Sequence, residues 1–337
     1  MKNSIEECLK RDMNKEQELP QTVRIALDQT YEQLLQQSKK KPKKQWLTTI
    51  AVAMATIILA SVVMFKNDTV LAKLQAFFGL NDPGIEIASD HGDVENVAQS
   101  QQSEDITISL EHFFTDAYRY AMQLKIESDD IQLDDLYDMN VEYRLYNENG
   151  EEIDAFVSDR KPKTASGIFS SGTFKLSNVN KYTATLEMLI ESSVKAIPPL
   201  EGAKIVIETV NFSSKQKGII SVDGEWAFDL KSATVESKVF VAENEVPGLE
   251  LQQATLTNGS MHISLLINRS IDDENFIMDI ALLTDKNEAF YANAANVEHK
   301  SDYTIVNLVF PYSVWNEQKT LLLSVNGYKK INLLKKE

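Results

Sequence analysis

The sequence predicts a mainly β protein with two tandem immunoglobulin-like β-sandwich domains outside a membrane, one transmembrane helix and a short helical cytoplasmic segment. Three observations lead to this prediction. Residues 46–65 form an uncharged run. From Asp105 onward, short stretches of alternating apolar and polar residues are separated by turn residues, which is typical of a β-sandwich. A second series of such stretches, in the same order, begins near residue 237 and indicates an internal repeat.

Residues 1–38 are predicted to form the cytoplasmic helical segment. Pro20 suits the first turn of a helix. One stripe of that helix, with three- and four-residue steps, consists of Val23, Leu27, Thr30, Tyr31 and Leu34. So short a segment cannot enclose its own core, so the stripe predicts a protein partner. The alternative is a linker lying on a membrane, but the polar face mixes acids and amides and is not rich in lysine.

Residues 39–45 are predicted as a basic flank and residues 46–65 as the transmembrane helix. About twenty residues make a helix of about 30 Å, which matches the bilayer core. A cleaved signal peptide is shorter and begins earlier in a chain, and a charge-free buried helix is hard to place in a chain that is 25% charged. The lysines before the run predict a single-pass cell-membrane protein with a cytoplasmic N-terminus and extracellular C-terminal domains.

Charge and cysteine content agree with this division. Residues 1–45 carry ten basic and seven acidic residues, whereas residues 67–337 carry 23 basic and 43 acidic ones. An acidic exterior argues against binding nucleic acid through a broad basic patch. Cys8 is the only cysteine, so the C-terminal part contains no disulfide, as in exported bacterial proteins that lack oxidative cross-links.

Residues 66–104 are predicted to form a juxtamembrane helix and a linker. An amphipathic pattern from Val70 to Phe78 ends at Gly79, and a turn is expected at 81–84. Residues 88–104 are polar and unpatterned, which favours a tether.

The first β-sandwich domain is predicted over residues 105–235 and the second over residues 236–337. Strands of the first are expected near 106–110, 120–126, 141–145, 182–189, 205–210 and 226–230. Strands of the second are expected near 249–256, 261–267, 277–283, 303–310 and 320–325. The last three stretches of the second series correspond to 141–145, 182–189 and 205–210, so we expect two diverged copies of one domain.

Side chains that could carry chemistry do not form a known constellation. The histidines, none with zinc-ligand spacing, are His91, His112, His262 and His299. An acidic group without the order of a calcium loop consists of Asp129, Asp130, Asp134, Asp135 and Asp138.

Other motifs also have simpler explanations. The stretch from Gly167 to Gly172 has phosphate-loop spacing but lacks the lysine. Its serines lack a nucleophile-elbow sequence. Trp226 and Trp315 are expected in the core. We therefore predict no catalytic residue, cofactor or metal site, and a protein that is not an enzyme.

Taken together, the segment from Leu19 to Leu34, the lysine cluster, the uncharged run, the helix from Leu71 to Gly79 and the tandem β domains resemble a known group. These are the membrane-anchored anti-sigma factor-like proteins of Gram-positive bacteria, which accompany extracytoplasmic-function sigma factors and carry exported domains of unknown function. The resemblance implies that the cytoplasmic helices hold a sigma factor and that an external signal releases it, with an envelope protease as one route of release. The chain lacks the His-x-x-x-Cys-x-x-Cys pattern of zinc-binding anti-sigma domains, so binding would use bare helices.

Two functions of different class remain open at this point. The first is a signal-transducing regulator of transcription, in which the helix stripe binds the sigma factor and the β domains sense an envelope signal. The second is a membrane-anchored extracellular adhesin or envelope scaffold that binds a wall ligand, with the N-terminal segment serving only as a topogenic tail. The stripe favours the first, because an anchor needs only the lysines.

Overall fold

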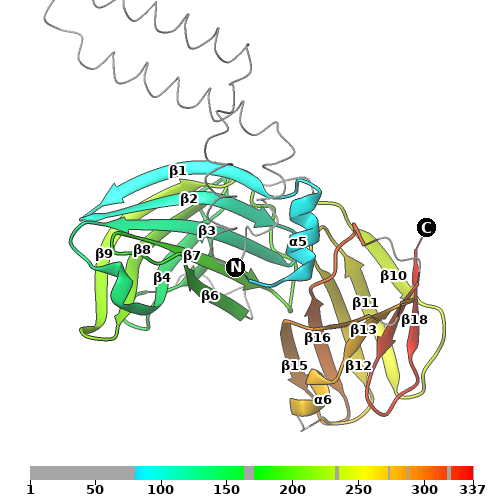
Figure 1. Cartoon of the computed structure of the whole chain (residues 1–337). Helices are drawn as coiled ribbons and strands as arrows, with labels where there is room; N and C mark the ends of the chain where they lie inside the picture. The colour runs from blue at the N-terminus through cyan, green and yellow to red at the C-terminus, as the bar shows by residue number, and fades with distance from the viewer. Residues whose placement is uncertain are drawn as a thin grey trace, which may run out of the picture. The chain divides into compact units, whose positions relative to one another are not determined.

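The first β-sandwich consists of two antiparallel sheets around one apolar core. The computed structural model describes residues 80–162, 171–231, 235–271, 274–286, 288–316 and 320–336. One sheet has the order β1-β2-β3-β7-β6 and the other the order β5-β4-β8-β9 (Figure 1). Their strands are β1 (Glu95–Ser103), β2 (Ile106–Thr115), β3 (Arg119–Ser128), β4 (Leu136–Tyr146), β5 (Glu152–Phe156), β6 (Ser171–Ser177), β7 (Thr183–Glu191), β8 (Lys204–Ser214) and β9 (Gly218–Asp229).

The core of the first sandwich follows from alternation along its strands. Ile106, Ile108 and Leu110 of β2 point inward and are fully buried, while the residues between them are partly exposed. Trp226 Nε1 donates to the Ile106 carbonyl at 3.0 Å, and the hydroxyls of Tyr120 and Tyr143 bond at 2.8 Å across the two sheets. The predicted core position of Trp226 is therefore confirmed, and polar atoms inside the core have partners.

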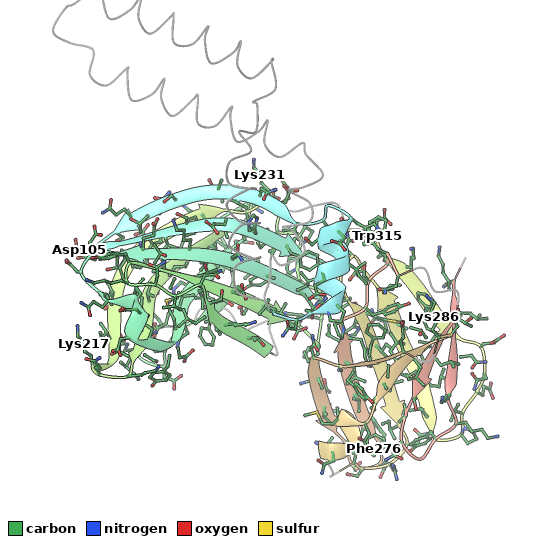
Figure 2. All side chains as sticks on the ribbon, in the orientation of Figure 1. Asp105, Lys217, Lys231, Phe276, Lys286 and Trp315 are labelled. Atoms are coloured by element: carbon green, nitrogen blue, oxygen red, sulfur yellow. The ribbon has the colours of Figure 1, made fainter. Side chains whose placement is uncertain are left out.

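The second sandwich has two sheets joined by a shared strand. Lys238 and Val239 of β10 pair with β11, whereas the rest of β10 pairs with β18. The continuous order is β14-β13-β17-β18-β10-β11-β12-β16-β15. The strands are β10 (Lys238–Ala242), β11 (Leu249–Leu256), β12 (Met261–Ile267), β13 (Ala281–Thr284), β14 (Ala289–Tyr291), β15 (Ala294–His299), β16 (Thr304–Phe310), β17 (Leu321–Ser324) and β18 (Ile331–Lys335). Side chains fill the space between the sheets of each sandwich (Figure 2).

Both sandwiches have the same topology. The order β2-β3-β7-β6 facing β5-β4-β8-β9 recurs as β11-β12-β16-β15 facing β14-β13-β17-β18. This is the order A-B-E-D facing C′-C-F-G of immunoglobulin-like sandwiches. Each copy also has a leading strand beside its first sheet, β1 or β10. The prediction of two copies of one β domain is confirmed by these strand orders.

Three local predictions are corrected. Residues 95–103, expected in a tether, form β1, which pairs with β2 at the sheet edge. Residues 277 and 278, expected in a strand, belong to the short helix α6 (Glu274–Met278), and a 3₁₀ turn, η1 (Leu133–Asp135), lies at the corresponding place in the first sandwich. The turn expected at 81–84 is the start of helix α5 (Pro83–Asp90), because Asp82 caps the helix and Pro83 occupies its first turn.

The prediction of a membrane span is also corrected. Throughout the ranges that the structure describes, no helix has both the length and the apolar character needed to cross a bilayer. The run at 46–65, its basic flank and the segment 1–38 lie outside those ranges. The transmembrane helix, the membrane assignment and the single-pass cell-membrane localisation are accordingly withdrawn.

Candidate functional site

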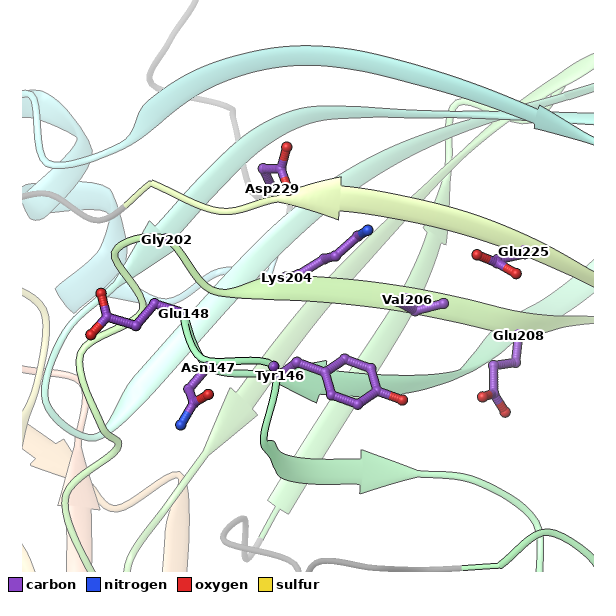
Figure 3. Close-up of a pocket in the computed structure, with 10 residues that line it drawn as sticks. Tyr146, Asn147, Glu148, Gly202, Lys204, Val206, Glu208, Glu225 and Asp229 are labelled. Atoms are coloured by element: carbon purple, nitrogen blue, oxygen red, sulfur yellow. The ribbon is translucent and has the colours of Figure 1, made fainter.

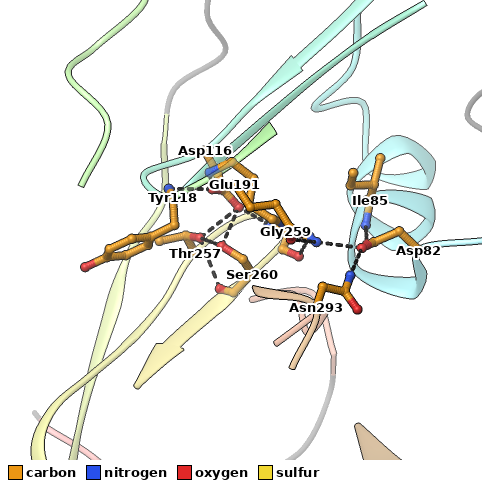
Figure 4. A network of polar contacts seen from close by, with 10 residues as sticks. Asp82, Ile85, Asp116, Tyr118, Glu191, Thr257, Gly259, Ser260 and Asn293 are labelled. Atoms are coloured by element: carbon orange, nitrogen blue, oxygen red, sulfur yellow. Dashed lines mark hydrogen bonds and ion pairs between the residues drawn. The ribbon is translucent and has the colours of Figure 1, made fainter. Parts of the chain in front are cut away.

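A buried arginine joins the first sandwich, the second sandwich and helix α5. Arg119, at the start of β3, has no solvent exposure. Its Nη1 lies 2.6 Å from Asp82 Oδ2 and 3.6 Å from Glu191 Oε1 at the end of β7. Its Nη2 donates to the carbonyl oxygen of Gly259, in the turn between β11 and β12 (Figure 4). We call the set Asp82, Asp116, Arg119, Glu191, Thr257, Gly259, Ser260 and Asn293 the joint network.

Asp116 holds the same turn of the second sandwich from the turn between β2 and β3. Its Oδ1 accepts the backbone N–H groups of Tyr118 and Arg119, both at 2.8 Å. Its Oδ2 accepts from Ser260 Oγ at 2.8 Å, Thr257 Oγ1 at 3.0 Å and Gly259 N at 3.2 Å. One carboxylate thus organises a turn of its own sandwich and binds a turn of the next (Figure 4).

Asp82 connects the beginning of α5 to both sandwiches. Its Oδ1 accepts the N–H of Ile85 at 2.9 Å, which is the helix N-cap bond. Its Oδ2 accepts from Arg119 of the first sandwich and from Asn293 Nδ2, before β15 of the second, at 2.7 Å. The Asp82 side chain is 2% exposed and Arg119 is fully buried, so the bond between them forms away from water, whereas Asn293 is exposed.

Glycine is required at two positions of the contact: Gly259 in the turn between β11 and β12, and Gly84 in the first turn of α5. A Cβ atom on Gly259 would lie 2.6 Å from Phe114 Cζ and 3.2 Å from Arg119 Nη2, and one on Gly84 would lie 2.9 Å from the Pro311 carbonyl carbon. Contacts under about 3 Å force neighbouring atoms to move, so any larger residue would separate the surfaces.

The joint network holds more acid than base. Three buried carboxyl groups, on Asp82, Asp116 and Glu191, surround one guanidinium. Burial lowers the pKa of Arg119, but these carboxylates raise it by more, so its pKa lies above the ordinary value and it stays charged. Burial raises the pKa of Glu191 to about 7, although the charge of Arg119 opposes that shift.

Two stacked aromatic pairs flank the joint network. Tyr118 stacks on His262 of β12 with ring centres 4.3 Å apart, and His262 Nε2 bonds to the Ser193 carbonyl at 2.8 Å. Burial lowers the pKa of His262, so the ring is neutral at pH 7. His91 stacks on Trp315 at 4.7 Å, and Trp315 Nε1 donates to Asp93 at 2.6 Å.

These pairs change the sequence interpretation of two residues. His91 does not lie in a loose tether but closes the C-terminal end of α5, where its Nδ1 bonds to the Ile87 carbonyl at 2.8 Å. Trp315 is only partly buried and joins that end of α5 to the second sandwich. The remaining histidines lie elsewhere: His112 is on β2, where burial lowers its pKa to about 4, and His299 is exposed.

The acidic group at 129–138 lies around η1. Asp135 accepts from Ser214 Oγ and from Gln216 N at 3.2 Å, so it holds the turn after β8. Among the residues that the structure describes, no three His, Cys, Asp or Glu side chains gather as metal ligands. The glycine- and serine-containing loop at 163–170, Cys8 and the predicted stripe Val23, Leu27, Thr30, Tyr31 and Leu34 lie outside the described residues.

An open cavity of about 530 Å³ lies on the outer face of the sheet β5-β4-β8-β9 (Figure 3). Tyr146 and Lys204 line it side by side, and its acidic lining residues are Glu148, Glu208, Glu225 and Asp229. Glu208 is already paired with Arg144 at 2.8 Å and Lys161 at 3.3 Å. Such solvated acidic faces are common, so the joint network is the stronger candidate.

Comparison with known proteins leaves the function open. No model of a protein family matches the sequence, and no curated protein matches it. Among solved structures, the crystal structure of the conserved domain protein from Bacillus anthracis is similar, with 13% identity and a TM-score of 0.44. The similarity covers 68% of this chain and 76% of that chain. A likeness this low supports no inference about function.

Sequence reasoning missed the joint network. Arg119 is in register with Gln123, Lys125 and Glu127 on the polar face of β3, so strand alternation predicts that it is exposed and does not indicate its burial. The one available signal was Asp82 before Pro83, which is a helix start as well as a turn sequence.

Proposed function

We propose that this chain is a regulator of the anti-sigma type, in which the two sandwiches form the input unit and the N-terminal helix stripe binds an extracytoplasmic-function sigma factor. The observation that carries the proposal is the position of Asp82. It lies at the beginning of the described chain, and its carboxylate bonds to one residue of each sandwich.

The joint network supports an input role for the sandwiches. Separating them would break the bonds from Asp116 to Thr257, Gly259 and Ser260, and the Asp82–Asn293 bond. Because Asp82 also caps α5, the same event would alter the point at which the preceding chain is attached. A signal that changes the contact between the two sandwiches would therefore change the attachment point of the residues that precede Leu80.

The output side of the proposal rests on the sequence. The stripe of Val23, Leu27, Thr30, Tyr31 and Leu34 has the three- and four-residue spacing by which an amphipathic helix fills an apolar groove. The resemblance to anti-sigma factor-like proteins supports a sigma factor as the partner that supplies this groove.

Binding of the full-length chain to an extracytoplasmic-function sigma factor from the same genome tests the proposal. We expect a 1:1 complex that Leu27→Asp abolishes, because a charge would be buried in the groove. Gln33→Asp is the matched control, since residue 33 is predicted to face away from the stripe, and it should bind as the unmodified chain does. If no sigma factor binds, or if both variants bind equally well, the proposed function is wrong.

The link between input and output has its own test. Asn293→Ala removes the bond from the second sandwich to Asp82 and should change sigma-factor affinity at least several-fold. Asn296→Ala, on β15 of the same sandwich, is the control and should leave the affinity unchanged. Equal affinity in the two variants would show that the sandwiches do not control the stripe.

A further inference from the structure

We propose that the joint network is a pH-sensitive latch, which is closed when the Glu191 carboxyl carries a proton and weakened when that proton is lost. This inference rests on the proposed function for its biological role, because it names the regulation of the same joint. Its physical basis is the arrangement of three buried carboxyl groups around one guanidinium at the contact between the two sandwiches (Figure 4).

Asp116 and Asp82 are each held by several hydrogen-bond donors. Asp116 accepts from five donors. Asp82 accepts from a backbone N–H, a guanidinium and an amide. Arg119 Nη1 is also 1 Å closer to Asp82 than to Glu191, at 2.6 against 3.6 Å. Glu191 is therefore stabilised less by the guanidinium than Asp82 is, and burial raises its pKa.

The charged groups that face Glu191 come from three elements. They are Arg119 on β3, Asp82 at the N-terminus of α5 and Asp116 between β2 and β3. If all three acids were ionised, the buried network would carry a net charge of two negatives, which is costly at a site without solvent. Protonation of one carboxyl halves this excess negative charge. Opening the contact to water also removes the free-energy cost, because the carboxylates are then hydrated.

The direction of the pH effect follows from the pKa of Glu191. Burial raises this pKa from 4.5 to about 7 in the closed joint, whereas an opened, hydrated carboxyl would return toward 4.5. A raised acid pKa favours the closed state fully below about pH 4.5, and the advantage is lost as the pH rises through about 7. The closing equilibrium should weaken by up to roughly a hundredfold between about pH 5 and about pH 8.

Hydrogen exchange of the full-length chain tests the latch without any partner. The Gly259 N–H donates to Asp116 and reports opening, whereas amides of β8 report unfolding of the first core. After correction for intrinsic exchange rates, protection in the peptide spanning 257–261 should fall by tens of fold from about pH 5.5 to about pH 8, with a much smaller change in β8. Constant protection at 257–261 would overturn the latch.

Glu191→Gln assigns the effect to one residue. The amide has the same shape and does not titrate, so we expect protection at 257–261 to become independent of pH. Glu187→Gln is the matched control: Glu187 is a buried carboxyl on the same strand and the same face, and it bonds to Ser177 instead of the joint. It should keep the original pH dependence. An unchanged pH dependence in Glu191→Gln would overturn the proposal, and protection of β8 shows whether the variant is folded.

The outcome is separable from that of the sigma-factor experiment. Exchange is measured on the chain alone, so a chain that binds no sigma factor can still have the latch. Conversely, if the chain binds the sigma factor but its hydrogen exchange does not depend on pH, only the latch proposal is overturned.

Discussion

Arg119 and Arg144 are each surrounded by carboxylates, but the two arginines occupy different kinds of place. Arg144, on β4, pairs with Glu152 at 2.8 Å and Glu208 at 2.8 Å and donates to the Pro162 carbonyl at 2.8 Å. All of these groups belong to the first sandwich, and Glu208 is 28% exposed. Arg119 has no exposure and connects two sandwiches and a helix.

This difference separates two uses of the same chemistry. Around Arg144, the side chain of Glu208 is 28% exposed and those of Arg144 and Glu152 are 9% exposed, so water reaches one side of the network and weakens the Arg144–Glu208 pair. Around Arg119, water is excluded, so each charge is stabilised only by its neighbours. Removal of one charge leaves the others buried and unpaired, at a large cost in free energy. A network of the second kind holds two domains in one arrangement and is sensitive to a single proton.

The largest effect is expected from Arg119→Met. It leaves three buried carboxyl groups without a counter-charge, so the free energy of unfolding should fall by about 3–5 kcal/mol. Urea unfolding of the full-length chain measures this loss, and protection of the Gly259 amide should fall with it. Arg119→Lys is the control, because it keeps the charge but not the planar fork, and its loss should be smaller. A loss below about 1 kcal/mol in Arg119→Met would contradict the comparison.

Gly259→Ala tests the joint by geometry instead of charge. The added methyl group would meet Phe114 Cζ at 2.6 Å, so we expect destabilisation of about 1–3 kcal/mol and faster exchange across the 257–261 turn. Gly172→Ala is the matched control, since its methyl group would meet the end of the Ile190 side chain at 3.1 Å and Phe174 Cε2 at an ordinary contact distance of 3.6 Å. Equal exchange at 257–261 in both variants would mean that the turn is not tightly packed against Arg119.

The repeat of the β domain could be predicted from the sequence because strand alternation is a local signal. Each copy marks its inward residues every second position, as in Ile106, Ile108 and Leu110, so strands and their order could be matched between copies. β1 escaped notice because Glu95–Ser103 is a polar edge strand with no apolar face. α6 was mistaken for a strand because a single apolar turn of helix resembles a short buried strand.

The joint network could not be derived in the same way. Arg119 and Gly259 are 140 residues apart in the chain, and Asp82 and Asn293 are 211 apart. No local pattern encodes such pairings. Arg119 lies on the polar face of its strand, so nothing local marks it as buried, and its partners depend on how the two sandwiches meet.

Arg144→Met should have the smallest effect, and its salt dependence sharpens the comparison. Loss of the guanidinium leaves Glu152 and Glu208 near the sheet surface, where Lys161 still pairs with Glu208 and water reaches the rim. We expect a loss of about 1 kcal/mol at low salt, and less at about 0.5 M salt, because screening weakens the partly exposed Arg144–Glu208 pair. The loss in Arg119→Met should change little with salt, since ions do not enter a site without solvent exposure. Urea unfolding of both variants at the two salt concentrations decides the matter. If both losses shrink alike, the Arg119 cluster is reached by solvent, and its role as a dry contact between the sandwiches is wrong.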